Sequence, residues 1–376
     1  MIRRFYVHNF RCLENFELPV AGRSSILLIG KNGAGKTTVL LALEILQKIA
    51  RGTNRVRDLL APKDLTRGRT DVPARFEIEA ELEGQVYEYA IAFELPEGFK
   101  ELRVREERLS VDGKPVYTRA EAEVHLSRSG SGTLQGLAKA SEAQFRIDWH
   151  LVALPIVQAQ SKGEPLAIFK DWLGRALILR PVPSMIGGAS DQETLQPKID
   201  VVNLAEWFSG TLAYTPAAYG DIQRYLKQVM PDLKDIQNPP VGKDSRSLVV
   251  QFSKSEATLR ISFEDLSDGE KCFMICALVL AAAEHYPPLL CFWDEPDNYL
   301  ALSEVGDFVM ALRQAFQSGG QFIATSHNPE AIRKFNDENT LVLQRKSHLE
   351  PTVVRKLSEL HGDGDLVDAL VLGDLN

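Results

Sequence analysis

Short uninterrupted apolar runs alternate with segments of helical periodicity in this chain. The runs at 25–29, 289–293 and 321–324 contain branched and aromatic residues and are too short for helices. Runs of this kind predict buried strands. The segments 37–50, 271–283 and 303–317 carry apolar residues at the density and spacing of buried helices. Together they predict an α/β fold.

The first half of the chain also contains segments with a two-residue periodicity. Residues 75–94 alternate between polar and apolar around Glu83-Gly84, as an antiparallel hairpin does. Strand-like pieces at 107–111 and 116–118 flank a turn at 112–115. These segments predict an antiparallel β-subdomain.

Helical patterning returns further along the chain. It begins at about residue 144 and covers 166–177 and 221–229, whereas 180–197 is rich in Pro, Gly and Ser and predicts an extended loop. We therefore expect a first lobe over 1–150, a mainly helical insertion over 151–260 and a second lobe over 261–376.

A glycine-rich turn joins the first buried strand to the helix behind it. Residues 30–37 read GKNGAGKT, the G-x-x-x-x-G-K-T pattern of a phosphate-binding loop. Glycines allow successive N–H groups to point at phosphate oxygens, and the helix N-terminus adds partial positive charge. Lys36 is expected to reach the β- and γ-phosphates and Thr37 to ligate Mg²⁺. A turn that merely connects two elements is disfavoured by this strand–loop–helix context.

Two carboxylates end the apolar run at 289–293. The carboxyl end of a strand in an α/β sheet faces the ligand, so Asp294 is predicted to hold Mg²⁺ and Glu295 to polarise an attacking water. His327 ends the segment 321–327 after an intervening helix. We expect it to contact the γ-phosphate and orient the water. The alternative is an ordinary surface or core histidine.

A further motif, LSDGE at 266–270, precedes the apolar helix at 271–283. Ser267 and the backbone around Gly269 therefore lie at a helix N-terminus, which is again an anion-binding geometry. With this motif the chain resembles the ABC-type ATPase superfamily, and more narrowly the soluble branch that contains SMC proteins, RecF and OLD-family ATPases. The opening strand followed by Asn9-Phe10-Arg11 and the DEPDNYL sequence at 294–300 are similar to the same branch.

The resemblance implies a P-loop ATPase head with an antiparallel β-subdomain and a helical insertion. Two heads are expected to dimerise head-to-tail, or to form a higher oligomer, with ATP held by the loop of one copy and Ser267 of the other. Arg11 is expected near the nucleotide. Gln158 or Gln160 is a candidate Mg²⁺ ligand, and a polar residue in a plain connecting loop is the equally weighted alternative.

The predicted cofactors are ATP and Mg²⁺, and the predicted site has three groups of residues. The catalytic residues are Glu295, His327 and Lys36, and the metal ligands are Thr37, Asp294 and Gln158. Nucleotide contacts are expected from Arg11, Asn32, Gly33, Ala34, Gly35, Lys36, Thr37, Thr38, Ser267, Gly269 and Glu270.

The formal net charge of −8 argues against a general nucleic-acid coat. A local exception follows the P-loop helix and consists of Lys48, Arg51, Arg55, Arg57, Lys63, Arg67 and Arg69. A contact with the phosphate backbone of DNA and an ordinary solvated face explain it equally well. Without interleaved aromatic residues the sequence does not indicate a platform for stacking single-stranded bases.

The longest apolar stretch, at 272–283, is shorter than the ~20 residues that a membrane helix needs. No secretory leader is evident after Met1, and the four cysteines lie within or beside predicted buried elements. These observations predict a cytoplasmic protein without a membrane partner and with core cysteines.

The first functional hypothesis is an ATPase whose ATP-driven dimerisation gates another activity in nucleic-acid surveillance, above all in bacterial antiviral defence. No long heptad insertion is present, and the segment after Pro329 is shorter than a Toprim nuclease domain. OLD-like ATPases that lack a nuclease of their own are typically encoded beside an effector, so the resemblance implies a separately encoded effector of the nuclease type as the partner. The alternatives are a DNA-repair ATPase similar to RecF and SMC proteins, the motor subunit of a transporter, and a switch protein that uses GTP or a dinucleotide. A transporter motor would need a surface that couples to membrane helices, and none is evident in this sequence. The LSDGE motif together with His327 argues against a switch protein.

Overall fold

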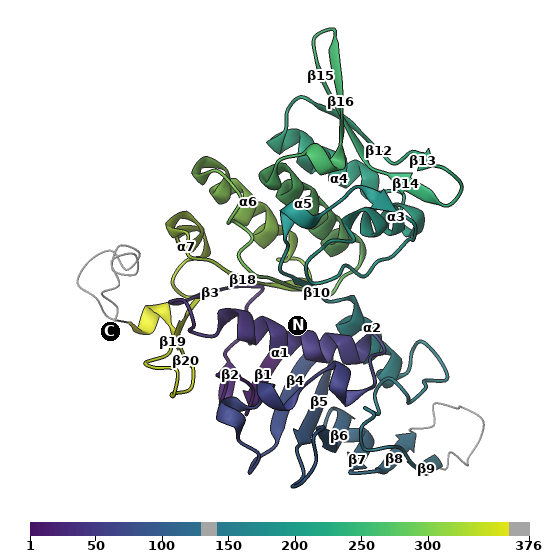
Figure 1. Ribbon diagram of the computed structural model, residues 1–376, viewed down its shortest axis with the longest axis vertical. Helices are drawn as coiled ribbons and strands as arrows, with labels where there is room; N and C mark the ends of the chain where they lie inside the picture. The colour runs from purple at the N-terminus through teal and green to yellow at the C-terminus, as the bar shows by residue number, and fades with distance from the viewer. Residues whose placement is uncertain (129–140, 361–376) are drawn as a thin grey trace. The chain divides into compact units, whose positions relative to one another are not determined.

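The computed structural model describes residues 1–128 and 141–360, so parts of the expected lobes at 1–150 and 261–376 lie outside the described residues. The chain divides into two compact units (Figure 1). Unit 1 comprises Met1–Gly22, Gly30–Gly174 and Leu343–Arg355. Unit 2 comprises Arg23–Ile29, Arg175–Val342 and the residues from Lys356 onward.

Unit 1 contains an eight-stranded antiparallel sheet in the order β2-β1-β4-β5-β6-β7-β8-β9. Its strands are β1 (Ile2–His8), β2 (Phe16–Leu18), β4 (Ala74–Leu82), β5 (Gln85–Glu94), β6 (Arg103–Val111), β7 (Lys114–Ala120), β8 (Glu123–Arg128) and β9 (Ser141–Arg146). The predicted hairpin at 75–94 is confirmed: Leu82 pairs with Gln85, and Glu83 and Gly84 turn the chain with positive φ angles of 51° and 77°. Burial alternates along β4 because only every second side chain faces the core.

Two helices complete unit 1, α1 (Lys36–Ala50) and α2 (Pro165–Arg175), the last residue of which begins unit 2. Most apolar side chains of α1 are buried, and Leu40 and Leu46 are completely so. On α2, Phe169 stacks against Tyr87 of β5 with ring centroids 6.2 Å apart. These contacts bury the apolar stripe of each helix.

Unit 2 is built on parallel strands in the order β10-β17-β18-β3-β19. The strand that follows at the edge, β20 (Val353–Lys356), belongs to unit 1 except for its last residue. These strands are β10 (Leu177–Leu179), β17 (Leu289–Trp293), β18 (Gly320–Thr325), β3 (Ser25–Ile29) and β19 (Thr340–Gln344), the last of which runs across the unit boundary. All residues of β17, β18 and β3 are buried, as expected of parallel strands covered on both faces. The three apolar runs identified in the sequence are therefore central strands.

The helices of unit 2 after the signature motif are α5 (Asp268–His285), α6 (Leu302–Ala315) and α7 (Pro329–Phe335). Segments 271–283 and 303–317 thus form helices whose ends differ from the predicted ones by one to three residues. Trp293 packs edge-on against Phe308 of α6, with ring centroids 5.6 Å apart. Among the described residues, no helix is long and apolar enough to cross a membrane.

The segment 151–260 holds more strand than the sequence predicts. It contains α3 (Leu204–Tyr214) and α4 (Ala218–Val229), and its strands are β11 (Ala189–Ser190), β12 (Leu233–Gln237), β13 (Pro240–Val241), β14 (Ser245–Ser247), β15 (Val249–Lys254) and β16 (Ala257–Ser262). Two small antiparallel sheets, β11-β14-β13 and β12-β15-β16, result. Sequence periodicity missed them because these strands are only two to six residues long, and β13 and β16 among them are mostly exposed, so that little apolar alternation remains to detect.

A buried carboxylate ties unit 1 together. The Glu107 carboxylate accepts hydrogen bonds from the hydroxyls of Tyr89 and Tyr117 at 3.0 and 2.7 Å, and burial keeps the pKa of both phenols well above its usual value. It also accepts the backbone N–H groups of Ala153 and Leu154 at 2.7 and 2.8 Å. One charged group thereby links two strands to the segment that leads out of the sheet.

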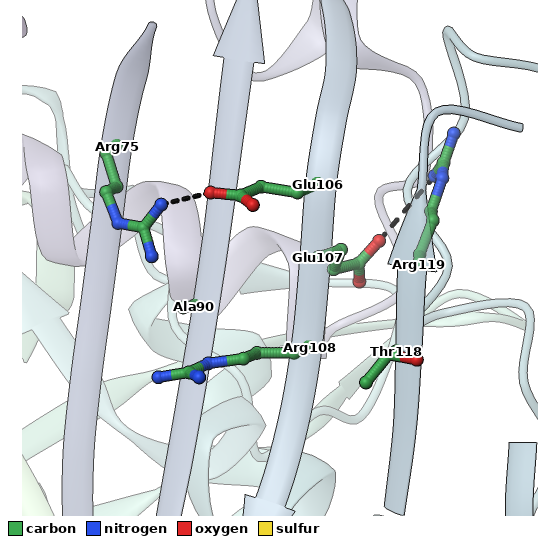
Figure 2. A pocket seen from close by; sticks show the side chains of 7 residues that line it. All are labelled: Arg75, Ala90, Glu106, Glu107, Arg108, Thr118 and Arg119. Carbon is green, nitrogen blue, oxygen red and sulfur yellow. Dashed lines mark hydrogen bonds and ion pairs between the residues drawn. The ribbon is translucent and has the colours of Figure 1, made fainter. Parts of the chain in front are cut away.

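Arg119 neutralises this carboxylate at 3.6 Å, and neither side chain is exposed to solvent (Figure 2). The guanidinium also donates to the backbone carbonyls of Glu121, Asp148 and Leu151. In the same view, Glu106 points away from this pair and contacts Arg75. Two adjacent residues of β6 therefore form different ion pairs: that of Glu107 is buried and that of Glu106 is exposed.

We expect Glu107→Ala to lower the free energy of unfolding by about 3–5 kcal/mol, because it leaves Arg119 and four donors without their buried acceptor. The neighbouring change Glu106→Ala removes an exposed pair and should alter it by less than about 1 kcal/mol. Urea unfolding followed by circular dichroism measures both. Equal effects of the two substitutions would contradict the role given to the buried carboxylate.

Candidate functional site

The glycine-rich loop follows β3 directly and leads into α1. Gly30, Gly33 and Gly35 all have positive φ angles, of 152°, 81° and 105°. A Cβ on Gly30 would lie 2.3 Å from the carbonyl oxygen of Leu343, and one on Gly35 would lie 2.8 Å from Thr352 Oγ1. Only glycine fits these two positions, which explains the spacing of the motif in terms of packing as well as ligand approach.

Helix α1 begins with Gly35 as its N-cap, and no side chain of the described residues caps it. The partial positive charge of a helix N-terminus favours an anion at this position. Lys36 is 7% exposed and its Nζ donates to the Gly30 carbonyl at 2.7 Å, so the side chain lies back along the loop. A phosphate fits this set of donors, with the Thr37 hydroxyl adjacent in sequence to complete a metal shell.

The acids lie in unit 2, at the carboxyl end of β17. Asp294 is 6% exposed, and its carboxylate accepts a 2.6 Å hydrogen bond from the Thr325 hydroxyl at the end of neighbouring β18. The same hydroxyl accepts a 2.8 Å bond from the Glu295 N–H. Arg180 lies 3.7 Å from the second Asp294 oxygen. The sequence analysis missed Thr325 and Arg180, although a polar residue that ends a buried strand is a recognisable signal for the first.

Glu295 adopts the left-handed backbone conformation, with φ of 52°. A residue with a side chain is strained there by about 1–2 kcal/mol, and such strain concentrates at functional positions. The conformation brings its carboxylate within 3.5 Å of His327 Nε2, and Asn298 donates to it at 2.5 Å. The structure thus brings together the two residues that the sequence analysis assigned to positioning water.

The turn after Glu295 is anchored to the same strand end. Ser326 donates to Asp297 at 2.8 Å, and Asp297 is 4% exposed. Burial raises the pKa of Asp297 above its usual value. The turn 297–300 is therefore connected to the residue just before His327, which links its position to that of the histidine.

The signature motif caps α5. The Ser267 side chain accepts from the Glu270 N–H at 3.3 Å, and the Glu270 carboxylate accepts from the Ser267 backbone N–H at 2.8 Å. A Cβ on Gly269 would lie 3.0 Å from the carbonyl oxygen of Tyr299. Ser267 itself is exposed, and Tyr299 is 44% exposed. The motif therefore presents a helix N-terminus on the surface of unit 2, against the turn that follows Glu295.

Strand connectivity relates the loop to this edge. In unit 2, β3 lies beside β18, with Leu28 paired to Thr325, and the Ser326 N–H donates to the Leu28 carbonyl at 3.3 Å. Gly30 is the next residue after β3 ends at Ile29. Within unit 2, the carboxyl end of β3 therefore lies at the same edge of the sheet as the carboxyl ends of β17 and β18, after which Asp294, Glu295 and His327 follow. In an open α/β sheet this is the edge at which ligands bind.

Comparison with known proteins identifies the chain. Residues 25–333 match the family described as "AAA domain, putative AbiEii toxin, Type IV TA system". The chain belongs to this AAA-domain family. The match includes the strand before the loop, the signature motif, the acids and His327.

This AAA-domain protein is also similar to one curated protein and to solved SMC heads. It is 49% identical over 45 residues to the OLD nuclease of Thermus scotoductus (strain ATCC 700910 / SA-01), a match that spans 12% of this chain and only 8% of that nuclease. An SMC head bound to the C-winged helix domain of ScpA aligns over 96% of this chain and 99% of its own, with a TM-score of 0.54 and 14% identity. An SMC head with an extended coiled coil, bound to the C-terminal domain of ScpA derived from Pyrococcus furiosus, aligns over 95% and 97%, with a TM-score of 0.53 and 12% identity. The predicted ATPase-head fold is confirmed, and the short match to an OLD nuclease agrees with the predicted relation to OLD-family ATPases.

Other predicted site residues of this AAA-domain protein lie in unit 1. Arg11 forms an ion pair with Asp64 at 3.0 Å. Asn32 and Gly33 are exposed, whereas Ala34 is buried and its carbonyl accepts from Thr352 at 2.9 Å. The remaining two, Thr38 and Gln158, are half-buried and exposed, respectively, and Gln158 lies in a loop without helix or strand. Their contacts with ATP and Mg²⁺ stay predictions.

We expect Thr325→Val to destabilise the protein by about 1–3 kcal/mol, because it removes the hydroxyl that serves the buried Asp294 carboxylate and the Glu295 N–H. Thr325→Ser keeps the hydroxyl and is the matched control. Urea unfolding measures the stability, and ATP turnover should fall for the valine variant alone. Equal turnover in both variants would show that the hydroxyl does not position the acids.

Proposed function

We propose that the protein binds and hydrolyses Mg-ATP. The loop 30–37 would hold the phosphates, with Lys36 on the β- and γ-phosphates, and Thr37 and Asp294 would hold Mg²⁺. The observation that carries the proposal is the Glu295 carboxylate, held 3.5 Å from His327 at the carboxyl ends of two adjacent buried strands. A carboxylate beside an imidazole at this edge is suited to accepting a proton from water and orienting it.

The proposed working unit is a head-to-tail pair of two copies. In the arrangement that the family resemblance implies, Ser267 and the start of α5 do not contact the ATP bound by the loop of their own copy. They contact the ATP bound by the loop of the other copy. The exposed signature motif, with Tyr299 and Leu302 exposed to 44% and 73% nearby, supports a surface that a second copy covers. Two ATP molecules would then join the copies, and hydrolysis would separate them.

The proposed role of this cycle is to gate a separately encoded effector in nucleic-acid surveillance, in a bacterial defence setting. The family description names a putative toxin of a toxin–antitoxin system, and the curated relative is a nuclease. Both support a protein that controls a damaging activity. The effector proposed here is of the nuclease type.

The experiment that tests the proposal combines turnover with solution mass. Purified protein should release phosphate from ATP only with Mg²⁺, and light scattering should show a higher mass with a non-hydrolysable ATP analogue than without nucleotide. Lys36→Ala should lack both responses while unfolding at the same urea concentration. If Lys36→Ala still released phosphate and still gained mass with the ATP analogue, the assignment of the loop would be refuted.

A further inference from the structure

The seven basic residues that the sequence grouped together differ in how their charges are compensated. Lys48 pairs at 2.8 Å with a glutamate one turn earlier on α1. Arg67 and Arg69 share the carboxylate of Glu14, at 2.6 and 2.5 Å. Arg51 donates to a backbone carbonyl of α2 at 2.9 Å, and burial lowers its pKa to about 10. These four residues are occupied by internal contacts.

Two arginines of the group instead line a common pocket in unit 1. Arg55 has no ion pair among the described residues, and Arg57 reaches Asp58 only at 3.9 Å, with both of those side chains more than half exposed. The pocket has a volume of about 250 Å³ and is lined by Arg55, Arg57, Glu101, Asp148, His150 and Leu151. Its walls are joined by a 2.9 Å hydrogen bond from the Val56 N–H to the His150 carbonyl. The two guanidinium groups are therefore displayed on a backbone that is held in place.

The two acids of this pocket differ in their contacts. Asp148 accepts from the His150 N–H at 2.7 Å and lies 3.1 Å from its ring Nδ1, so its carboxylate is engaged within its own loop. Glu101 has no hydrogen bond or ion pair among the described residues. It is the acid that opposes an anion in this pocket.

An exposed tryptophan adjoins the pocket. Trp149 lies in sequence between Asp148 and His150, and its carbonyl accepts from the Val104 N–H at 2.8 Å. Arg103 lies over its ring at 4.4 Å, yet 42% of the residue remains exposed. The other three tryptophans, Trp172, Trp207 and Trp293, are exposed to 3% or less. An exposed indole is therefore carried by the residue between Asp148 and His150, two residues that line the pocket with Arg55 and Arg57.

We propose that this pocket and Trp149 form a binding site for single-stranded nucleic acid. The guanidinium groups of Arg55 and Arg57 would contact adjacent backbone phosphates, and a base would stack on Trp149. The inference narrows the nucleic-acid part of the proposed function to one site and does not depend on ATP hydrolysis. Duplex DNA is disfavoured because its paired bases cannot reach an indole at the protein surface.

The site is tested by titrating the full-length protein, without nucleotide, with thymidine and uridine oligonucleotides of about 16 nucleotides. Because Trp149 is the exposed tryptophan, base stacking should quench intrinsic fluorescence, and Trp149→Phe should abolish the signal. Anisotropy of labelled oligonucleotides measures the affinity independently. Comparison of the thymidine oligonucleotide with the uridine oligonucleotide distinguishes DNA from RNA as the ligand. A duplex of the same length should bind more weakly than either.

The variants separate the phosphate contacts from the stacking contact. Trp149→Ala should weaken binding roughly tenfold. Arg55→Glu should weaken it at low salt and flatten the dependence of log K on log salt by roughly 0.7 or more. Glu101→Gln should tighten binding because it removes the opposing charge. Lys63→Glu is the matched control, since it changes an exposed charge of the same basic group outside the pocket and should have a smaller effect than Arg55→Glu.

Three results would overturn the proposal. Absence of fluorescence quenching together with equal effects of Arg55→Glu and Lys63→Glu would mean that the site binds no nucleic acid. Sensitivity to Arg55→Glu but not to Trp149→Ala would reduce it to a general anion site, as would equal affinity for heparin. ATP turnover of Arg55→Glu and Trp149→Ala should equal that of wild type. A negative result for nucleic-acid binding would therefore not contradict the proposed ATPase activity.

Discussion

Glu295→Gln should lower ATP turnover by about 10²–10⁴-fold, because an amide cannot accept the proton of the attacking water. Glutamine has nearly the same shape and retains one oxygen for the Asn298 hydrogen bond, so the strained turn should persist. ATP binding should survive, and the protein should accumulate as an ATP-bound dimer. Phosphate release measures the first effect, and light scattering with and without Mg-ATP measures the second.

The control for this substitution is Glu338→Gln, which makes the same chemical change at an exposed position outside the site. It should leave turnover and mass unchanged. Wild-type turnover in Glu295→Gln would remove Glu295 as the base. A mass that ignores ATP in an otherwise inactive variant would instead indicate an assembly formed before ATP binds.

Ser267→Arg should abolish hydrolysis while sparing nucleotide binding, because Ser267 is proposed to contact ATP held by the other copy. The arginine adds bulk and charge at the exposed start of α5 and removes a helix cap worth about 1 kcal/mol. Ser267→Ala removes the same cap without the bulk and is the control for stability. Equilibrium binding of a fluorescent ATP analogue, measured beside turnover, separates the two functions.

Mixing two inactive variants tests the head-to-tail arrangement directly. Lys36→Ala lacks the loop lysine and Ser267→Arg lacks the signature contact. A heterodimer of the two contains one site with both defects and one site with neither, so mixing should restore hydrolysis that neither variant shows alone. If mass spectrometry shows mixed dimers but hydrolysis is not restored, Lys36 and Ser267 of one copy would contact the same bound ATP, which contradicts the head-to-tail arrangement.

The motifs were readable from the sequence because each is a local device. Gly30 and Gly35 have positive φ angles that favour glycine, and the strand that precedes them is marked by a short, fully buried run. The same holds for the acids after β17 and for the cap at Ser267. The strand, the loop and the helix are neighbours in sequence, so short-range physics suffices to recognise them.

Contacts between distant segments were not readable in this way. The Thr325 hydroxyl serves Asp294 across 31 residues, and Arg180 reaches the same carboxylate from β10. The small strand β16 was also missed, because an exposed strand carries little periodic signal. Sequence separation removes any local pattern that could indicate such contacts.

The basic segment after α1 shows the division most clearly. The sequence by itself determined its seven positive charges, together with the family of the chain and the positions of the loop, acid and LSDGE motifs. Only the tertiary structure decided which charges remain available, because Glu14 occupies Arg67 and Arg69, whereas Arg55 and Arg57 line a pocket with residues some ninety positions away in sequence, Asp148 and His150. Charge is a property of single residues, whereas its compensation depends on which segments fold against one another.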